Sequence, residues 1–249
     1  MSTPQHSVGR LRTWWRRQQY EPGPLGWLVN PFYIARKELL RSVQGCLSEL
    51  RGEVLDVGCG HQCYRRYLGA TRYVGLDLDT PEARALGVAE VYYDGGVFPI
   101  PDASFDAVLC SQVFEHVFTP GAFLAEIRRV LRPGGRLVLT VPFVWDEHEQ
   151  PRDFGRYTSF GLRAVLEQAG LEVISLRKSV ADSRALFQLA NAYLYKVTHS
   201  RSEALNHLVA VGVMAPVNLA GLVLGGLLPA NPDLYLDNIV VARKPRPPG

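Results

Sequence analysis

A glycine-containing turn and an acidic residue downstream of it can together hold a ligand. Asp56 ends an apolar run and is followed by Gly58 and Gly60. Both glycines lack a Cβ, so the backbone can turn sharply and a ligand can approach it closely. Asp77 ends the next apolar run about 20 residues later, where an acid can accept hydrogen bonds from both ribose hydroxyls, and Asp79 could take the same role. These residues predict a ligand cradle, and the helix expected after it would point free N–H groups at the ligand.

The spacing of the glycines distinguishes a dinucleotide from other ligands. The dinucleotide fingerprint G-x-G-x-x-G requires a third glycine at position 63, where this chain has Cys63. A pyrophosphate is therefore not the favoured ligand. The carboxylate of Asp56 can instead pair with an amino group or orient the loop.

A second group of reactive residues follows the fifth expected strand. His148 has an ordinary pKa close to neutrality and can take a proton from a hydroxyl group. Glu147 or Asp153 can orient its imidazole. Arg156 and Tyr157 can hold an anionic or hydroxylated acceptor. In the alternative interpretation, Asp153, Arg156 and Tyr157 form a structural clasp that His148 caps.

His148 and His116 could in principle serve other chemistry. His148 does not belong to a zinc-protease motif, because position 152 is not a histidine and Pro151 interrupts the required helix. His116 is expected to be a hydrogen-bonding loop residue rather than a catalytic one. The histidines and acids show no metal-ligand spacing, so the sequence predicts no metal site.

Apolar runs and helical periodicity alternate along the chain, which predicts an α/β fold with these residues at the carboxyl ends of parallel strands. The strands are expected near residues 54–57, 72–77, 91–94, 108–110, 136–141, 171–176 and 235–243, and the helices near 33–50, 63–68, 122–131, 159–169 and 185–197.

An apolar insertion separates the last two expected strands. Residues 208–230 carry no charge, and a helix needs about 20 apolar residues to span a bilayer. A single crossing is excluded if the flanking strands pair in one sheet, since both ends then lie on the same side. Pro216, Asn218 and several glycines favour two short helices with a break near Pro216. Such a hairpin would enter one leaflet, cover the acceptor site, or pack against a second subunit as a homodimer.

Composition limits the class of protein. The 249 residues are 47% hydrophobic and 20% charged, as expected for a folded domain, and the net charge of +3 does not indicate nucleic-acid binding. Four cysteines without a C-x-x-C pair favour a reducing cytoplasm. Residues 1–30 place arginines beside Trp14 and Trp15 without the apolar core of a secretory signal. They predict either a segment that contacts anionic lipid or a tail that folds over the domain.

The motifs Asp56-x-Gly58-x-Gly60, Gly75-Leu76-Asp77 and Asp94-Gly95 occur in the order seen in class I S-adenosylmethionine (SAM) dependent methyltransferases of the type 11 group, which residues 50–142 resemble. The resemblance implies a Rossmann-like, mostly parallel seven-stranded sheet with helices on both faces and SAM as the cofactor. Family members often have Thr-Gly where this chain has His61-Gln62. The cofactor contacts that the resemblance implies are Asp56, Gly58, Cys59, Gly60, Asp77, Leu78, Asp94, Gly95, Ser111 and Gln112.

A narrower resemblance rests on residues 30–33, 147–151 and 234–238, which are similar to bacterial methyltransferases associated with surface-polysaccharide and lipopolysaccharide biosynthesis. It implies O-methylation of a sugar hydroxyl on a nucleotide-linked or lipid-linked glycan, in the cytoplasm or at the inner face of the membrane. Two alternatives stay open: methylation of a lipophilic molecule such as a quinone precursor, and a SAM-binding regulator or assembly partner without turnover. The expected parts are an N-terminal extension (1–30), the methyltransferase core (31–182), the insertion (183–232) and the last strand with its tail (233–249).

Overall fold

The computed structural model describes Gln18 and residues 21–247. The predictions made for the arginines and tryptophans near the N-terminus therefore lie outside the described residues. The chain forms two compact units. One unit contains the described residues up to Arg41 together with Ser179–Leu236, and the other contains Ser42–Lys178 and the chain from Asp237 onward.

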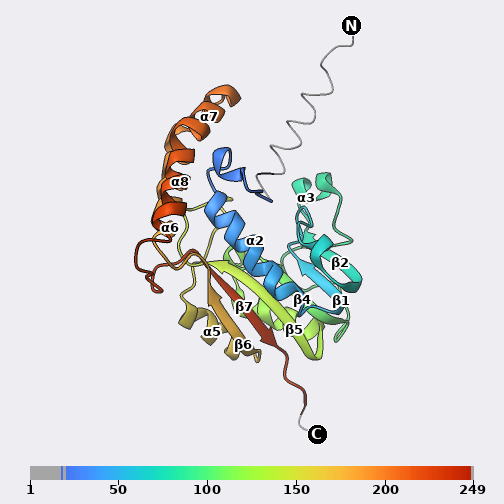
Figure 1. The fold of residues 1–249 in the computed structure, drawn as a ribbon. Helices are drawn as coiled ribbons and strands as arrows, with labels where there is room; N and C mark the ends of the chain where they lie inside the picture. The colour runs from blue at the N-terminus through green and yellow to red at the C-terminus, as the bar shows by residue number, and fades with distance from the viewer. Residues whose placement is uncertain (1–17, 19–20, 248–249) are drawn as a thin grey trace. The chain divides into compact units, whose positions relative to one another are not determined.

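The second unit is built on a seven-stranded sheet (Figure 1). Its order is β3-β2-β1-β4-β5-β7-β6, and β7 runs antiparallel to both of its neighbours while all other pairs are parallel. The predicted mostly parallel sheet is confirmed. The strands are β1 (Gly52–Val57), β2 (Ala70–Leu78), β3 (Val91–Tyr93), β4 (Phe105–Ser111), β5 (Leu131–Pro142), β6 (Glu172–Lys178) and β7 (Asp237–Arg243).

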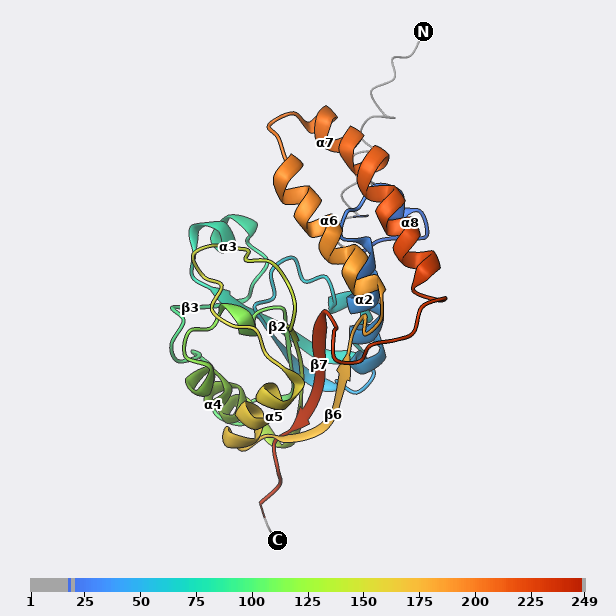
Figure 2. The ribbon, with the colours of Figure 1, turned by 90° about the vertical axis from the view of Figure 1, so that its left-hand side faces the viewer.

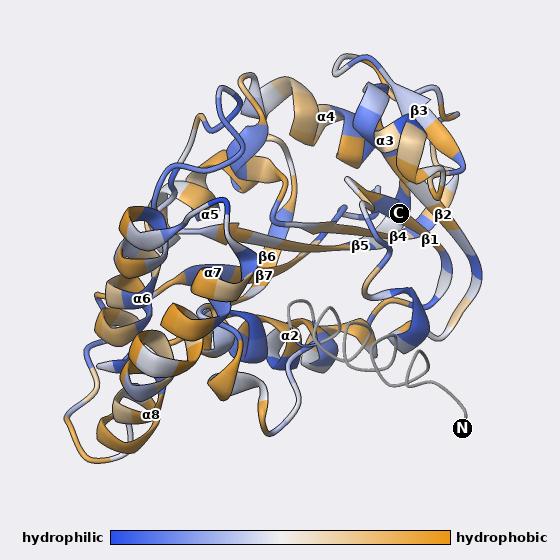
Figure 3. Cartoon of the chain, turned by 90° about the horizontal axis from the view of Figure 1, so that it is seen from above, coloured by the Kyte–Doolittle hydropathy of each residue, from blue (hydrophilic) through white to orange (hydrophobic). Residues whose placement is uncertain are grey.

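Helices cover both faces of this sheet (Figure 3). Successive strand residues point to opposite faces, so Leu55 and Val57 join the core beneath α4 (Pro120–Val130) and α5 (Ser159–Gln168). The end of α2 (Tyr33–Leu47) lies over the other face. The sheet order reverses between β1 and β4, and ligands of open α/β sheets bind at the carboxyl ends of the strands beside such a reversal.

The segment after the glycine turn does not form the predicted α-helix. It contains only a three-residue 3-10 helix, η2 (Arg65–Tyr67), without a buried residue. Gln62 adopts a left-handed φ of 52°, which breaks a helical run, and a short segment with no apolar face to bury cannot offset the cost of helix nucleation. The helix N-terminus that we expected at the ligand is therefore absent from this described segment. The N–H groups that could face a ligand here are those of the glycine turn.

One helix was not predicted. α3 spans Pro81–Leu86, follows an N-cap at Thr80 whose Oγ1 accepts a hydrogen bond from the Ala83 N–H (3.2 Å), and ends at Gly87 in the left-handed conformation. The sequence contains both capping signals of this helix, because Thr-Pro is a typical helix start and glycine is a typical helix end. The helix is too short for hydrophobic periodicity to reveal it.

The first unit contains η1 (Gly26–Leu28), the start of α2 and the insertion between β6 and β7. The insertion comprises α6 (Arg184–Thr198), α7 (Glu203–Val209), a π-helical turn (Ala210–Met214) and α8 (Ala215–Leu224). The predicted break near Pro216 is wrong: Glu203–Leu224 is a continuous helical segment. Pro216 lies in the first turn of α8, directly after the π-turn, and such turns accommodate a backbone position that lacks its N–H.

The two arms of this helical hairpin, α6 and α7–α8, lie side by side (Figure 2), and buried side-chain amides connect them. The Asn191 side chain on α6 donates to Asn218 Oδ1 (3.0 Å) and to the Met214 carbonyl (3.1 Å), and Asn218 in turn donates to the carbonyls of Trp27 and Asn30. The helical segment 203–224 is long and apolar enough to cross a membrane by length and composition, and only 28% of its most apolar window is buried. Its exposed large side chains are Leu205, Leu208, Val211, Val213, Leu219, Leu222 and Val223.

Candidate active site

The glycine turn after β1 is shaped as the sequence predicts. Gly58 and Gly60 have φ values of 69° and 44°, the left-handed region that favours glycine. The N–H groups of Gly58 and Cys59 donate to the Leu76 carbonyl at 2.8 and 3.2 Å, so the turn is fixed to β2. A Cβ on Gly58 would lie 2.3 Å from Val113 Cγ2, whereas a Cβ on Gly60 would meet no atom within 4 Å. The turn is therefore closed on the β4 side and open in front of Gly60.

Asp77 lies against this open part of the turn. Its Oδ2 accepts a hydrogen bond from the Gly60 N–H (3.0 Å), and its Oδ1 accepts one from the Leu78 N–H (2.8 Å). Asp79, the alternative ribose acid, is instead held by two hydrogen bonds from the Arg84 guanidinium at 2.7 and 2.8 Å. The structure thus favours Asp77 over Asp79 for ribose recognition.

Asp56 is buried beneath the turn rather than exposed to a ligand. Only 4% of its surface is accessible, and its Oδ2 accepts a hydrogen bond from the Tyr73 hydroxyl at 2.6 Å. Burial raises the pKa of the Asp56 carboxyl to about 7. Of the two roles that the sequence left open for this residue, the geometry favours orientation of the loop.

The raised pKa of Asp56 predicts a pH-dependent stability. Between its unfolded pKa of about 4 and its folded pKa of about 7, the folded protein retains a proton that the unfolded chain has released, so stability falls as pH rises. Each pKa unit corresponds to about 1.4 kcal/mol. Asp56→Asn keeps an acceptor for the Tyr73 hydroxyl and removes the titration. We expect the free energy of urea unfolding to fall less steeply across this pH range in the variant; parallel curves would contradict the assignment.

The remaining predicted cofactor residues lie at the ends of β3 and β4. Asp94 is exposed and accepts a hydrogen bond from the Gly96 N–H at 2.9 Å. A Cβ on Gly95 would lie 3.6 Å from Leu78 Cδ2, which places the loop after β3 beside the end of β2. At the end of β4, Ser111 Oγ and Gln112 Nε2 both contact Thr140 Oγ1, at 2.8 and 3.2 Å.

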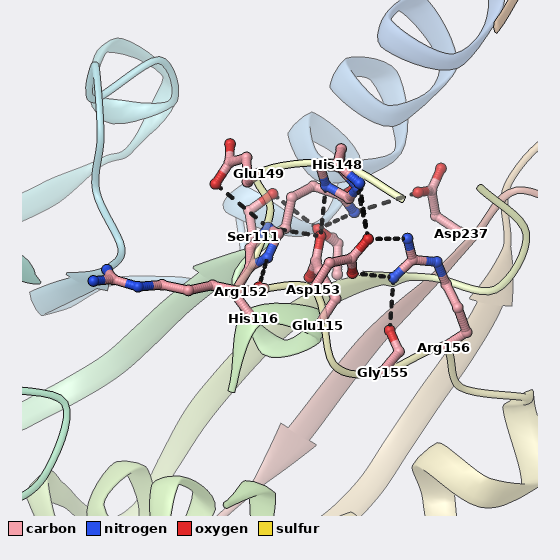
Figure 4. Close-up of polar contacts among 12 residues, drawn as sticks. Ser111, Glu115, His116, His148, Glu149, Arg152, Asp153, Gly155, Arg156 and Asp237 are labelled. Carbon is pink, nitrogen blue, oxygen red and sulfur yellow. Dashed lines mark hydrogen bonds and ion pairs between the residues drawn. The ribbon is translucent and has the colours of Figure 1, made fainter. Parts of the chain in front are cut away.

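A cluster of one acid and two histidines lies at the carboxyl ends of β4 and β5 (Figure 4). We call Glu115, His116 and His148 the Glu115 cluster. Glu115 Oε1 lies 3.9 Å from His116 Nε2 and 4.0 Å from His148 Nε2, and the two imidazole rings are 5.0 Å apart. Glu115 and His116 belong to a 3-10 helix (Phe114–His116) after β4, and His148 belongs to the loop after β5.

Glu115 has an unusual environment. Its side chain is fully buried, and neither carboxylate oxygen has a hydrogen-bond partner among the described residues. Burial raises its pKa to about 8. Its backbone carbonyl accepts hydrogen bonds from the Phe154 and Gly155 N–H groups at 2.8 and 3.1 Å, which fixes the loop of His148 over the end of β4.

Asp153 contacts His148. Asp153 Oδ2 accepts a hydrogen bond from the His148 backbone N–H (2.9 Å) and lies 3.3 Å from its Nδ1. Arg156 binds both oxygens of Asp153, at 2.5 and 2.7 Å, and lowers the pKa of that carboxyl to about 2. Glu147 is exposed and accepts a hydrogen bond from Gln150.

The geometry of Arg156 and Tyr157 favours the structural clasp. Arg156 is engaged by Asp153 and by the carbonyls of Asp146 and Gly155. Tyr157 packs against Phe114 with ring centroids 4.9 Å apart and lies at the edge of the hydrophobic core. Contact of either residue with an acceptor stays a prediction.

Comparison with known proteins shows what this core is similar to. Residues 55–139 match the model of a methyltransferase domain family. This segment is similar to a methyltransferase domain. Residues 55–139 contain Gly58, Asp77, the Asp94 loop and the first two members of the Glu115 cluster. The match thus includes both sides of the point where the sheet order reverses.

Individual relatives cover part of the chain. A probable SAM-dependent methyltransferase of Mycolicibacterium smegmatis is 36% identical over 36% of this chain and 38% of its own. A ubiquinone biosynthesis O-methyltransferase of Bradyrhizobium is 37% identical over 38% of this chain and 41% of its own. The chain therefore spans less than half the length of either relative. A phosphoethanolamine N-methyltransferase of Haemonchus contortus, solved with SAM, shares the fold at 15% identity, with a TM-score of 0.55 over 92% of this chain and 59% of the other.

The fold joins residues that the sequence treated separately. Sequence reasoning gave His148 a role and left Glu115 without one, and it treated His116 as a hydrogen-bonding loop residue. In the structure His116 Nδ1 lies 2.6 Å from the Arg152 carbonyl oxygen. The adjacent Glu115-His116 pair was the available signal. Its link to His148 depends on the side-by-side position of β4 and β5.

Proposed function

We propose that this chain is an O-methyltransferase that uses SAM and takes the proton of its acceptor hydroxyl at the Glu115 cluster. The observation that carries the proposal is the arrangement of two polar sites around the β1–β4 reversal of the sheet. The glycine turn and Asp77 lie on the β1–β2 side, and the Glu115 cluster lies on the β4–β5 side. The packing of Val113 against Gly58 connects them, because Glu115 follows Val113 by two residues.

The cofactor side fits a nucleoside with a ribose. The carboxylate of Asp77 can exchange its contact with the Gly60 N–H for ribose hydroxyls, and the open space in front of Gly60 leaves room for the ligand. SAM supplies, when bound, an electrophilic methyl group on a sulfonium sulfur. The protein then has to align the acceptor and exclude water.

The acceptor side fits removal of a hydroxyl proton. His148 Nδ1 lies 3.3 Å from both the Asp146 carbonyl and Asp153 Oδ2, so the proton of the neutral ring belongs on Nδ1. Nε2 then carries the lone pair and can accept the hydroxyl proton. The ionised Asp153 stabilises the resulting imidazolium, as a carboxylate behind a catalytic histidine does.

The acceptor is either a sugar hydroxyl or a phenolic hydroxyl. The sugar on a nucleotide-linked or lipid-linked glycan follows from the narrower sequence resemblance, and the quinone precursor agrees with the printed name of the Bradyrhizobium relative. Both carry a hydroxyl that must lose a proton before methylation. The exposed apolar side of segment 203–224 suggests attachment to the inner face of a membrane. Such attachment would suit a lipid-linked form of either acceptor.

The test is transfer of radiolabelled methyl groups from SAM into two sets of acceptors. One set contains nucleotide-linked and lipid-linked glycans, and the other contains prenylated and unprenylated catechols. Label in one set assigns the acceptor class. Protein that binds S-adenosylhomocysteine tightly and labels neither set would support the SAM-binding regulator instead.

A further inference from the structure

We infer that Glu115, His116 and His148 bind a divalent transition-metal ion. The three side chains supply two imidazole nitrogens and a carboxylate oxygen, and these atoms all lie within 4.8 Å of one another. Two histidines and one carboxylate form a common ligand set of catalytic zinc and of other first-row divalent ions. The sequence predicted no metal here because the ligands come from two separate loops.

The tautomers of both histidines leave lone pairs facing the carboxylate. His116 Nδ1 lies 2.6 Å from the Arg152 carbonyl oxygen, which can only accept, so this nitrogen carries the proton. His148 Nδ1 likewise faces acceptors only, the Asp146 carbonyl and Asp153. The Nε2 atom of each neutral ring is therefore unprotonated and faces Glu115 Oε1. Such hydrogen bonds from the distal ring nitrogen are the usual support of a metal-binding histidine.

The unpartnered acid at this point also favours a cation. The carboxyl of Glu115 is fully buried and has no hydrogen-bond partner among the described residues, and a buried polar group without a partner is costly. Glu149 Oε2 adds another acidic oxygen 3.6 Å from His116 Nε2. The nearby Arg156 donates its hydrogen bonds to Asp153 and gives none to the Glu115 oxygens. A metal ion among the three ligand atoms would satisfy the carboxylate and both lone pairs at once.

The metal site would add a step to the proposed function. Its role in turnover rests on that proposed function. A three-ligand ion keeps an open position, where the acceptor hydroxyl can bind. The ion lowers the pKa of that hydroxyl; the O–H bond breaks, the electron pair stays on oxygen and the proton leaves to solvent. The oxygen would then attack the methyl group of SAM: the O–C bond forms, the S–C bond breaks with its electron pair on sulfur, and S-adenosylhomocysteine leaves. In this form His148 acts as a ligand, whereas in the metal-free form it acts as the base.

Titration of chelator-treated protein with Co²⁺ tests the site without reference to turnover. We expect visible absorption bands that saturate at one ion per chain, and competition by Zn²⁺. Glu115→Gln, His116→Gln and His148→Gln should each weaken Co²⁺ binding by more than the roughly 10- to 100-fold loss that follows removal of an outer-shell partner. His207→Gln is the matched control, since His207 is an exposed histidine on α7 outside the cluster. Affinity for S-adenosylhomocysteine, measured on every variant, reports folding.

The outcomes separate the metal site from the methyltransferase proposal. No saturable Co²⁺ binding by protein that still binds S-adenosylhomocysteine would overturn the metal site and leave the methyltransferase proposal standing. Equal Co²⁺ affinity in all four variants would also overturn it. Co²⁺ binding that depends on the cluster, without methyl transfer to any acceptor, would support the site and count against the proposed reaction. Turnover that survives complete chelation would overturn the activating role of the ion.

Discussion

His148→Ala is expected to lower methyl transfer by about 100- to 10,000-fold, the usual contribution of a positioned acid–base group, and to leave S-adenosylhomocysteine affinity nearly unchanged. The imidazole is held by Asp153 at 2.9 and 3.3 Å and belongs to the β4–β5 side of the site. The cofactor contacts of the glycine turn and Asp77 belong to the β1–β2 side. Steady-state kinetics with labelled SAM and calorimetric titration with S-adenosylhomocysteine measure the two quantities separately.

The control for this variant is His207→Ala, which removes an exposed imidazole from α7 and should alter neither quantity. Turnover of His148→Ala equal to that of the wild type would contradict the role of His148. A parallel loss of cofactor affinity would show instead that the loop after β5 supports the fold of the site, which is the structural clasp interpretation.

Asp77→Ala is expected to weaken S-adenosylhomocysteine binding by at least about tenfold. The carboxylate would accept hydrogen bonds from two ribose hydroxyls, and hydrogen bonds to charged groups contribute about 1.5–3 kcal/mol each. The substitution also removes the acceptor of the Gly60 N–H, which loosens the turn at the same place. Calorimetric titration gives the affinity, and thermal unfolding of the ligand-free protein reports any general loss of stability.

Asp79→Ala is the matched control for this second prediction. Asp79 lies two residues from Asp77 and is bound by Arg84, so its removal should leave the affinity near that of the wild type. Equal weakening by both substitutions would indicate a nonspecific effect of negative charge. Weakening by Asp79→Ala alone would transfer ribose recognition to that residue. Tight binding by neither wild type nor control would show that His61-Gln62, where the family often has Thr-Gly, excludes the cofactor.

The sequence by itself determined the sheet and the shape of the glycine turn beside Asp77. Buried parallel strands are short apolar runs, and in β1, β2 and β4 each run ends at the residues that face the ligand edge. Asp56, the two glycines and Asp77 are close along adjacent strands, so local pattern was enough to bring them together. Local pattern also gave α2, α4, α5 and α6, because each buries one apolar side.

Only the tertiary structure decided three features. It showed that Pro216 does not divide the segment Glu203–Leu224, because a π-turn precedes it. It showed that Arg84 holds Asp79 with two hydrogen bonds, whereas Asp77 contacts the glycine turn. It brought Glu115 and His116 to His148, because parallel pairing of β4 with β5 places their following loops side by side. Contacts between residues distant in sequence depend on strand order, which the periodicity of a single segment does not contain.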